Sequence, residues 1–162
     1  MDGLNPREAG TPADLEAQRR RRRFDRVGRL VGDDAMDRLQ AAHVMVFGLG
    51  GVGAWAAEAL VRSGIGEITV VDFDQVCITN LNRQVQALEG LVGKLKSEVM
   101  ADRLRQINPQ LKVHVRSEFY NLESAPGFFL ERPDYVVDAI DAVTCKCHLL
   151  SYCRREKIPV VT

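Results

Sequence analysis

The chain has 162 residues, of which 46% are apolar and 27% are charged, as is ordinary for a globular domain. Its 22 basic and 22 acidic residues balance, so the chain as a whole is not a polyelectrolyte binder. No apolar run reaches membrane-spanning length and no secretory signal precedes the core, which argues against a membrane protein. The four cysteines form no C-x-x-C pair and no disulfide scaffold, so we expect a reducing, cytoplasmic location.

The N-terminal segment differs in composition from the rest of the chain. Residues 1–22 are polar, contain proline and glycine, and lack apolar periodicity, which predicts a disordered basic tail. An arginine run covers residues 19–23. Such a run is usually a solvated arm, and the alternative is a contact with the phosphates of a nucleic-acid substrate. The folded domain is expected to cover residues 23–162.

Helical and strand patterns alternate along that domain. A helical pattern begins at Phe24, and Asp33 could cap the short helix that follows. Strands are predicted at 43–47, 68–71, 111–115, 135–137 and 159–162, and helices at 54–62, 97–107 and roughly 146–155. The apolar strands indicate a parallel sheet that is covered on both faces. We therefore expect an α/β fold with a doubly wound, Rossmann-like sheet in three layers, truncated at the C-terminus because the last pattern stops at Thr162.

A glycine-rich turn joins the first predicted strand to the next helix. Its glycines follow the pattern Gly-x-Gly-x-x-Gly. Gly48 permits a tight turn, Gly50 lets the backbone approach a phosphate, and Gly53 allows the helix to pack closely on the strand. The free N–H groups of the helix N-terminus favour phosphate oxygens, and Asp72 could accept hydrogen bonds from a ribose. This motif alone predicts a nucleotide and does not choose between NAD and ATP.

Charged residues farther along the chain favour ATP. Arg83 and Lys96 follow the second predicted strand, and Asp141 follows a later one. Ligands of open α/β sheets bind outside the carboxyl ends of the strands, so the three side chains could converge on the glycine turn. Two cations and a carboxylate suit a triphosphate with Mg²⁺, with Asp141 holding the metal. For any one of them alone, an ordinary surface ion pair explains the residue equally well.

Residues 23–162 resemble the ubiquitin-activating-enzyme-like adenylation family, which includes the ThiF- and MoeB-type adenylyltransferases. The shared motifs are the glycine turn, Asp72-x-Asp74, Asn80-x-Asn-Arg-Gln84 and the later aspartates Asp138 and Asp141. The resemblance implies that ATP and Mg²⁺ are the cofactors and that Arg83, Lys96, Asp141 and Arg26 are catalytic. It also implies that Arg26 reaches the ATP of a partner subunit, and hence a homodimer. The implied nucleotide-binding set is Gly48, Gly50, Gly51, Gly53, Asp72, Asp74, Asn80, Arg83, Gln84 and Lys96, with Asp141 as the metal ligand.

Within this family, residues 23–32, 74–80 and 152–159 look most like those of the tRNA threonylcarbamoyladenosine dehydratases. That likeness implies a tRNA substrate whose threonyl carboxylate is adenylated and then cyclised, with a sulfur-relay protein as a further possible partner. One alternative is an adenylyltransferase that activates the C-terminal glycine of a ubiquitin-like sulfur carrier. Two others are a catalytically silent dimerisation scaffold and an NAD-dependent oxidoreductase.

Overall fold

A computed structural model describes Thr11 and residues 22–162. The predicted tail, apart from Thr11 and Arg22, therefore lies outside the described residues. Within the described part, five strands form one sheet in which every pairing is parallel. None of the helices in this part of the chain has the length and apolar character needed to cross a membrane.

The order of the strands confirms the predicted doubly wound sheet. The strands are β1 (His43–Phe47), β2 (Glu67–Val71), β3 (Lys112–Arg116), β4 (Tyr135–Asp138) and β5 (Val160–Val161), in the order β3-β2-β1-β4-β5. The order reverses between β1 and β4, and in folds of this kind the segments that follow the two strands leave toward opposite faces of the sheet and open a crevice between them. Phe47, the last residue of β1, is paired with Val71 on one side and Asp138 on the other.

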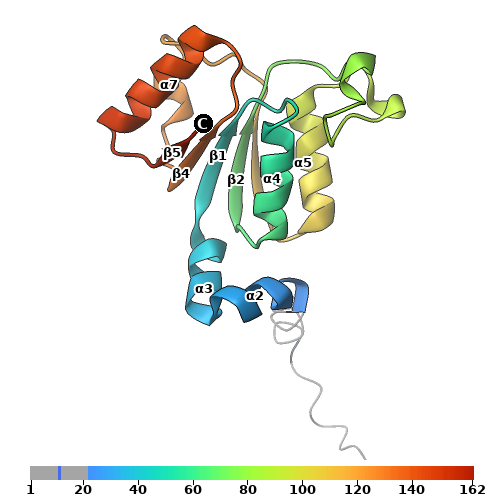
Figure 1. Ribbon diagram of the computed structural model, residues 1–162, viewed down its shortest axis with the longest axis vertical. Helices are drawn as coiled ribbons and strands as arrows, with labels where there is room; N and C mark the ends of the chain where they lie inside the picture. The colour runs from blue at the N-terminus through green and yellow to red at the C-terminus, as the bar shows by residue number, and fades with distance from the viewer. Residues whose placement is uncertain (1–10, 12–21) are drawn as a thin grey trace, which may run out of the picture.

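Helices cover both faces of this sheet. Figure 1 shows α4 (Gly53–Arg62) and α5 (Lys96–Ile107) together on one face and α7 (Val143–Arg155) on the other. The pair α2 (Asp25–Val31) and α3 (Asp33–Ala41) lies at the amino ends of the strands, below the sheet in that view. The short elements η2 (Ile78–Asn80), η3 (Glu89–Leu91) and α6 (Ala125–Phe128) complete the described chain, and the sequence patterns did not predict them.

The sheet separates the two larger of the three hydrophobic clusters in the described residues. Val46 and Phe47 are both fully buried, and they face opposite sides because successive strand residues alternate. Val46 packs in the cluster that α4 and α5 cover, and Phe47 packs with residues of α6 and α7 such as Phe128 and Leu149. The apolar strand runs that predicted burial on both faces are thus explained by a helix layer on each side.

Two details of the predicted helices need correction. Asp33 is the first residue of α3 and forms no capping hydrogen bond, because Gly32 occupies the N-cap position with a φ of 83°. Asp33 still stabilises the start of α3, because an acidic residue in the first turn interacts favourably with the helix dipole. The last helix begins at Val143, three residues before the predicted start, and ends at Arg155 as expected.

Candidate active site

A pocket of about 650 Å³ opens beside the glycine turn, at the carboxyl edge of the sheet. The sequence-predicted site residues that line it are Gly48, Gly50, Gly51, Asp72, Asp74, Asn80, Arg83, Gln84, Lys96 and Asp141. They come from the turn after β1, the segment after β2, the first residue of α5 and the segment after β4, as the rule on strand carboxyl ends predicts. Gly53 and Arg26 do not line this pocket.

The glycines of the turn serve two different purposes. Gly48 has a φ of 86°, and a Cβ atom there would lie 2.6 Å from the carbonyl oxygen of Ala139. A Cβ atom on Gly53 would overlap the carbonyl oxygen of Gly48. A Cβ atom on Gly50 would meet no protein atom within 4 Å, because this residue faces the pocket. Gly48 and Gly53 therefore permit the fold of the turn, whereas Gly50 leaves room for a ligand.

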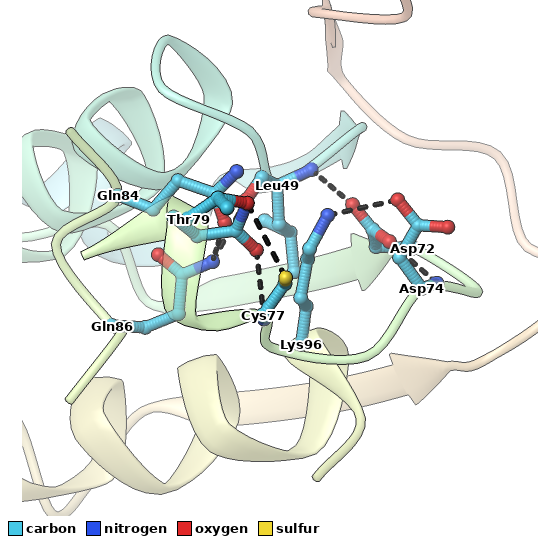
Figure 2. Close-up of polar contacts among 9 residues, drawn as sticks. Leu49, Asp72, Asp74, Cys77, Thr79, Gln84, Gln86 and Lys96 are labelled. Atoms are coloured by element: carbon cyan, nitrogen blue, oxygen red, sulfur yellow. Dashed lines mark hydrogen bonds and ion pairs between the residues drawn. The ribbon is translucent and has the colours of Figure 1, made fainter. Parts of the chain in front are cut away.

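Asp72 ties the end of β2 to the glycine turn. Its carboxylate accepts a hydrogen bond from the backbone N–H of Leu49 at 2.6 Å and another from that of Asp74 at 2.8 Å, as Figure 2 shows. Burial raises the pKa of this carboxyl, and the two backbone hydrogen bonds only partly offset the effect. Each carboxylate oxygen can accept more than one hydrogen bond, so Asp72 could still accept from a ribose hydroxyl.

Gln86 holds the same turn from the other side and was missed in the sequence. Its amide nitrogen donates to the carbonyl oxygen of Leu49 at 2.8 Å, and its side chain is buried. Leu49 is therefore fixed at its N–H by Asp72 and at its carbonyl by Gln86 (Figure 2). The amide oxygen of Gln86 is buried without a hydrogen-bond partner among the described residues. No local pattern marks this glutamine, since its partner lies 37 positions away.

Lys96 carries a buried cation at the start of α5. Its ammonium group lies 2.8 Å from the carboxylate of Asp74, and in Figure 2 the two side chains point toward each other beside Asp72. The Lys96 side chain is 8% exposed and that of Asp74 is 50% exposed. An ammonium group has three N–H donors, so a phosphate oxygen can approach Lys96 while Asp74 keeps one of them.

The loop between β2 and α5 is held by its own polar groups. The side-chain oxygen of Asn80 accepts from the backbone N–H of Cys77 at 3.0 Å, which leaves its amide NH₂ group as the potential donor to a ligand. Arg83 donates from Nη1 to the carbonyl of Thr79 and to Asn82, each at 2.9 Å. Its guanidinium is solvent-exposed and retains further N–H groups, so it can contact an anion in the pocket.

The two aspartates after β4 have different environments. Asp138 is buried; its carboxylate lies 2.7 Å from the ammonium of Lys146 and also accepts from the backbone N–H of Ile140. Asp141 is exposed and lines the pocket, and its carboxylate has no hydrogen bond or ion pair with any described residue. Mg²⁺ is commonly held by one or two carboxylates together with waters and substrate phosphates, so Asp141 fits that metal and Asp138 does not.

Aromatic side chains also line the pocket, and the sequence analysis did not predict them. Phe73 and Phe119 meet edge to face, with ring centroids 4.9 Å apart, and both line the pocket. Tyr120 lines it as well, and its hydroxyl lies 3.0 Å from Nδ1 of His148. Burial raises the pKa of Tyr120, so its hydroxyl stays protonated. Phe119 and Tyr120 follow β3 closely, so the rule on strand carboxyl ends could have identified them.

Arg26 lies far from this pocket within one chain. It belongs to α2, which Figure 1 places at the amino edge of the sheet, whereas the pocket lies at the carboxyl edge. A single chain therefore does not bring Arg26 to the other predicted site residues. The expectation that it serves a partner subunit remains a prediction.

The chain resembles known proteins both in sequence and in fold. The model of the ThiF family matches residues 24–162. The tRNA threonylcarbamoyladenosine dehydratase of Haemophilus influenzae is 49% identical over 140 residues, which cover 86% of this chain and 54% of that protein. The structure of the Escherichia coli dehydratase TcdA in complex with ATP is 51% identical, with a TM-score of 0.86, over 88% of this chain and 58% of that one.

A second group of relatives is more distant. The molybdopterin-synthase adenylyltransferase of Escherichia coli is 32% identical over 129 residues, which cover 80% of this chain and 51% of that protein. The chain spans about half the length of the curated relatives that it matches. With the family match over nearly all of the described residues and the glycine turn in its pocket, the chain belongs to the ThiF family.

Proposed function

We propose that this chain is the nucleotide-binding part of an ATP-dependent tRNA threonylcarbamoyladenosine dehydratase. The observation that carries the proposal is the convergence of the glycine turn, Arg83, Lys96 and Asp141 on one pocket at the carboxyl edge of the sheet. Higher identity to the bacterial dehydratases than to the molybdopterin-synthase adenylyltransferase supports a tRNA substrate over a sulfur-carrier protein.

The proposed nucleotide lies across the glycine turn with its phosphates near Gly50 and Gly51. Asp72 accepts from the ribose, and Asp74, through its ion pair, keeps the Lys96 ammonium at the pocket wall. Asn80, Arg83 and Lys96 donate to the phosphates, and Gln84 completes the buried side of the site. Gly53 contributes only by allowing α4 to begin next to the turn, which presents its free N–H groups to the phosphates.

The proposed reaction has two steps. A carboxylate oxygen of the threonyl group forms a bond to the α-phosphorus of ATP, and the bond to pyrophosphate breaks. A nitrogen of the same modified side chain then attacks the activated carbonyl carbon, closing a ring as AMP leaves. The tRNA nucleotide thus loses the elements of water. Because the attacking nitrogen belongs to the same side chain, its effective concentration at the activated carbonyl is high. Arg83 and Lys96 stabilise the negative charge that grows on pyrophosphate in the first step.

Asp141 is proposed to hold Mg²⁺ at the outer phosphates. Its uncommitted, exposed carboxylate at the pocket is the feature that supports this assignment. Bound there, the metal would neutralise part of the charge on the triphosphate. Asp138 supports the segment that carries Asp141, because it fixes the backbone N–H of Ile140 and is itself neutralised by Lys146.

The proposal includes a homodimer in the cytoplasm. Arg26 lies outside its own pocket, and in a dimer it would contact the ATP of the other subunit. Mixing Arg26→Ala with Asp141→Ala protein should then restore activity through hybrid dimers with one intact site. A tRNA substrate and four free cysteines support a cytoplasmic location. A sulfur-relay protein remains part of the proposal as a further partner.

The proposed activity is tested by ATP–pyrophosphate exchange. The chain is incubated with ATP, labelled pyrophosphate and either tRNA that carries threonylcarbamoyladenosine or a ubiquitin-like sulfur carrier. Exchange that depends on the modified tRNA supports the proposal. Exchange that depends only on the sulfur carrier would assign the chain to the other group of adenylyltransferases, and unmodified tRNA of the same sequence is the matched control.

A further inference from the structure

A second pocket lies at the amino edge of the sheet, away from the glycine turn. It has a volume of about 470 Å³ and is lined by Arg23, Phe24, Arg62, Arg103, Gln106 and Ile107. Its three arginines come from the segment before α2, the last residue of α4 and the second half of α5. In Figure 1 the lower ends of α4 and α5 lie above α2. We call this cavity the arginine pocket.

Two of these guanidinium groups are held by one buried carboxylate. Glu58 has a side chain that is 7% exposed, and its oxygens lie 2.8 Å from Nε of Arg62 and 2.5 Å from Nε of Arg103. Burial raises the pKa of Glu58, but the hydrogen bonds from Arg103 and Arg62 outweigh it, and the net pKa is lowered. The carboxylate is therefore charged at neutral pH and positions both arginines.

The remaining arginine is held separately. Nη1 of Arg23 donates to the side-chain oxygen of Asn108 at 2.6 Å. Three guanidinium groups and one carboxylate leave the arginine pocket with an excess of two positive charges. Each guanidinium has five N–H donors, and the hydrogen bonds to Glu58 and Asn108 use only one or two of them. The free donors form a fixed array that suits phosphate oxygens.

We propose that the arginine pocket binds the phosphodiester backbone of RNA. This inference rests on the proposed tRNA substrate, and it assigns a backbone contact away from the nucleotide that is modified. Arg23 is the last member of the arginine run at residues 19–23, so further cations directly precede this pocket arginine in the sequence. A row of cations matches the repeated phosphates of a polymer better than a single small anion.

The test measures the binding of fluorescently labelled, unmodified tRNA to the full chain by anisotropy at several salt concentrations. Arg23→Ala removes one cation from the pocket, and Gln106→Glu adds a carboxylate while breaking no hydrogen bond of the described residues. Each should weaken binding by about 3- to 10-fold at moderate salt, and Arg23→Ala should reduce the slope of log K against log salt by about 1. No ATP or threonylcarbamoyl group is needed.

Arg105→Ala is the matched control. Arg105 lies on α5 like Arg103 but is outside the arginine pocket, and its removal deletes the same charge from an exposed ion pair with Asp102. Its RNA affinity should stay within about twofold of the wild type. Equal losses for Arg105→Ala and Arg23→Ala would overturn the proposal, as would an unchanged affinity for Gln106→Glu or no tRNA binding by the wild type.

Light scattering and pyrophosphate exchange separate the remaining outcomes. An altered oligomeric mass of Arg23→Ala with unchanged RNA affinity would show that the pocket contacts protein, which also overturns the proposal. Failure of the proposed function would appear differently, as an absence of tRNA-dependent exchange in a wild-type protein whose RNA binding still depends on Arg23 and Gln106.

Discussion

The pocket at the carboxyl edge of the sheet and the arginine pocket at its amino edge both gather cations, but they hold them differently. Lys96 has one carboxylate partner, Asp74, which is half exposed and can yield to a ligand. Arg62 and Arg103 share Glu58, whose carboxylate is buried and binds both guanidinium groups at once, so displacing it would leave both without their partner. The Lys96 ammonium in the carboxyl-edge pocket can therefore exchange its partner for a ligand, whereas the arginines of the arginine pocket stay in fixed positions, as a docking surface requires.

The largest expected effect concerns Asp141, whose carboxylate lines the carboxyl-edge pocket and has no hydrogen bond or ion pair with any described residue. Asp141→Ala should lower ATP–pyrophosphate exchange by more than about 100-fold, because a metal ligand supplies several kcal/mol of charge stabilisation. The melting temperature should hardly change, since the Asp141 side chain forms no hydrogen bond or ion pair with a described residue. Exchange at the wild-type rate would remove Asp141 from the metal site.

Two glycine substitutions at the same edge distinguish a glycine that the backbone fold requires, Gly53, from one that leaves room for a ligand, Gly50. Gly53→Ala should destabilise the protein by about 3 kcal/mol, because the new methyl group meets the Gly48 backbone, which cannot move without displacing the turn. Gly50→Ala should leave the free energy of unfolding nearly unchanged and weaken ATP binding instead. Urea unfolding and calorimetric ATP titration of both variants measure the two quantities. A larger loss of unfolding free energy for Gly50→Ala than for Gly53→Ala would contradict these two roles.

The smallest effect concerns Glu58 at the amino edge. Glu58→Gln should cost about 1–3 kcal/mol at pH 7, because the hydrogen bonds to both arginines lose their ionic partner. The folded-state pKa of Glu58 lies below its ordinary value of 4.5, so its contribution is present above that pH and is lost as pH falls through the lowered pKa.

Stability measured against pH tests that assignment. Below about pH 4.5 the difference in unfolding free energy between wild type and Glu58→Gln should shrink toward zero. A difference that is constant from pH 7 down to the acid limit would show that the carboxylate is not what fixes the two arginines.

Much of the fold and of the first pocket could be predicted because the signals are local. The strand at 43–47 is a continuous apolar run, and the glycine pattern places a turn and a helix start directly after it. One topological rule then brings Arg83, Lys96 and Asp141 to the same edge, where the structure has them. The cap predicted at Asp33 was wrong because the preceding glycine adopts a positive φ that the sequence does not reveal.

What could not be predicted depends on contacts between distant residues. Gln86 is linked to Leu49 across 37 positions, and Arg103 to Glu58 across 45. A glutamine in a loop and a glutamate in a helix carry no pattern that distinguishes a buried partner from a solvated one. The ion pairs of Lys96 with Asp74 and of Asp138 with Lys146 could not be predicted either, because each joins residues of different elements.

The most direct test of the central claim is calorimetric titration of the chain with ATP in the presence of Mg²⁺, and with NAD under the same conditions. We expect saturable ATP binding that weakens when Mg²⁺ is withdrawn, together with no NAD binding at comparable concentrations. Binding of NAD without binding of Mg²⁺-ATP would contradict the assignment of the carboxyl-edge pocket.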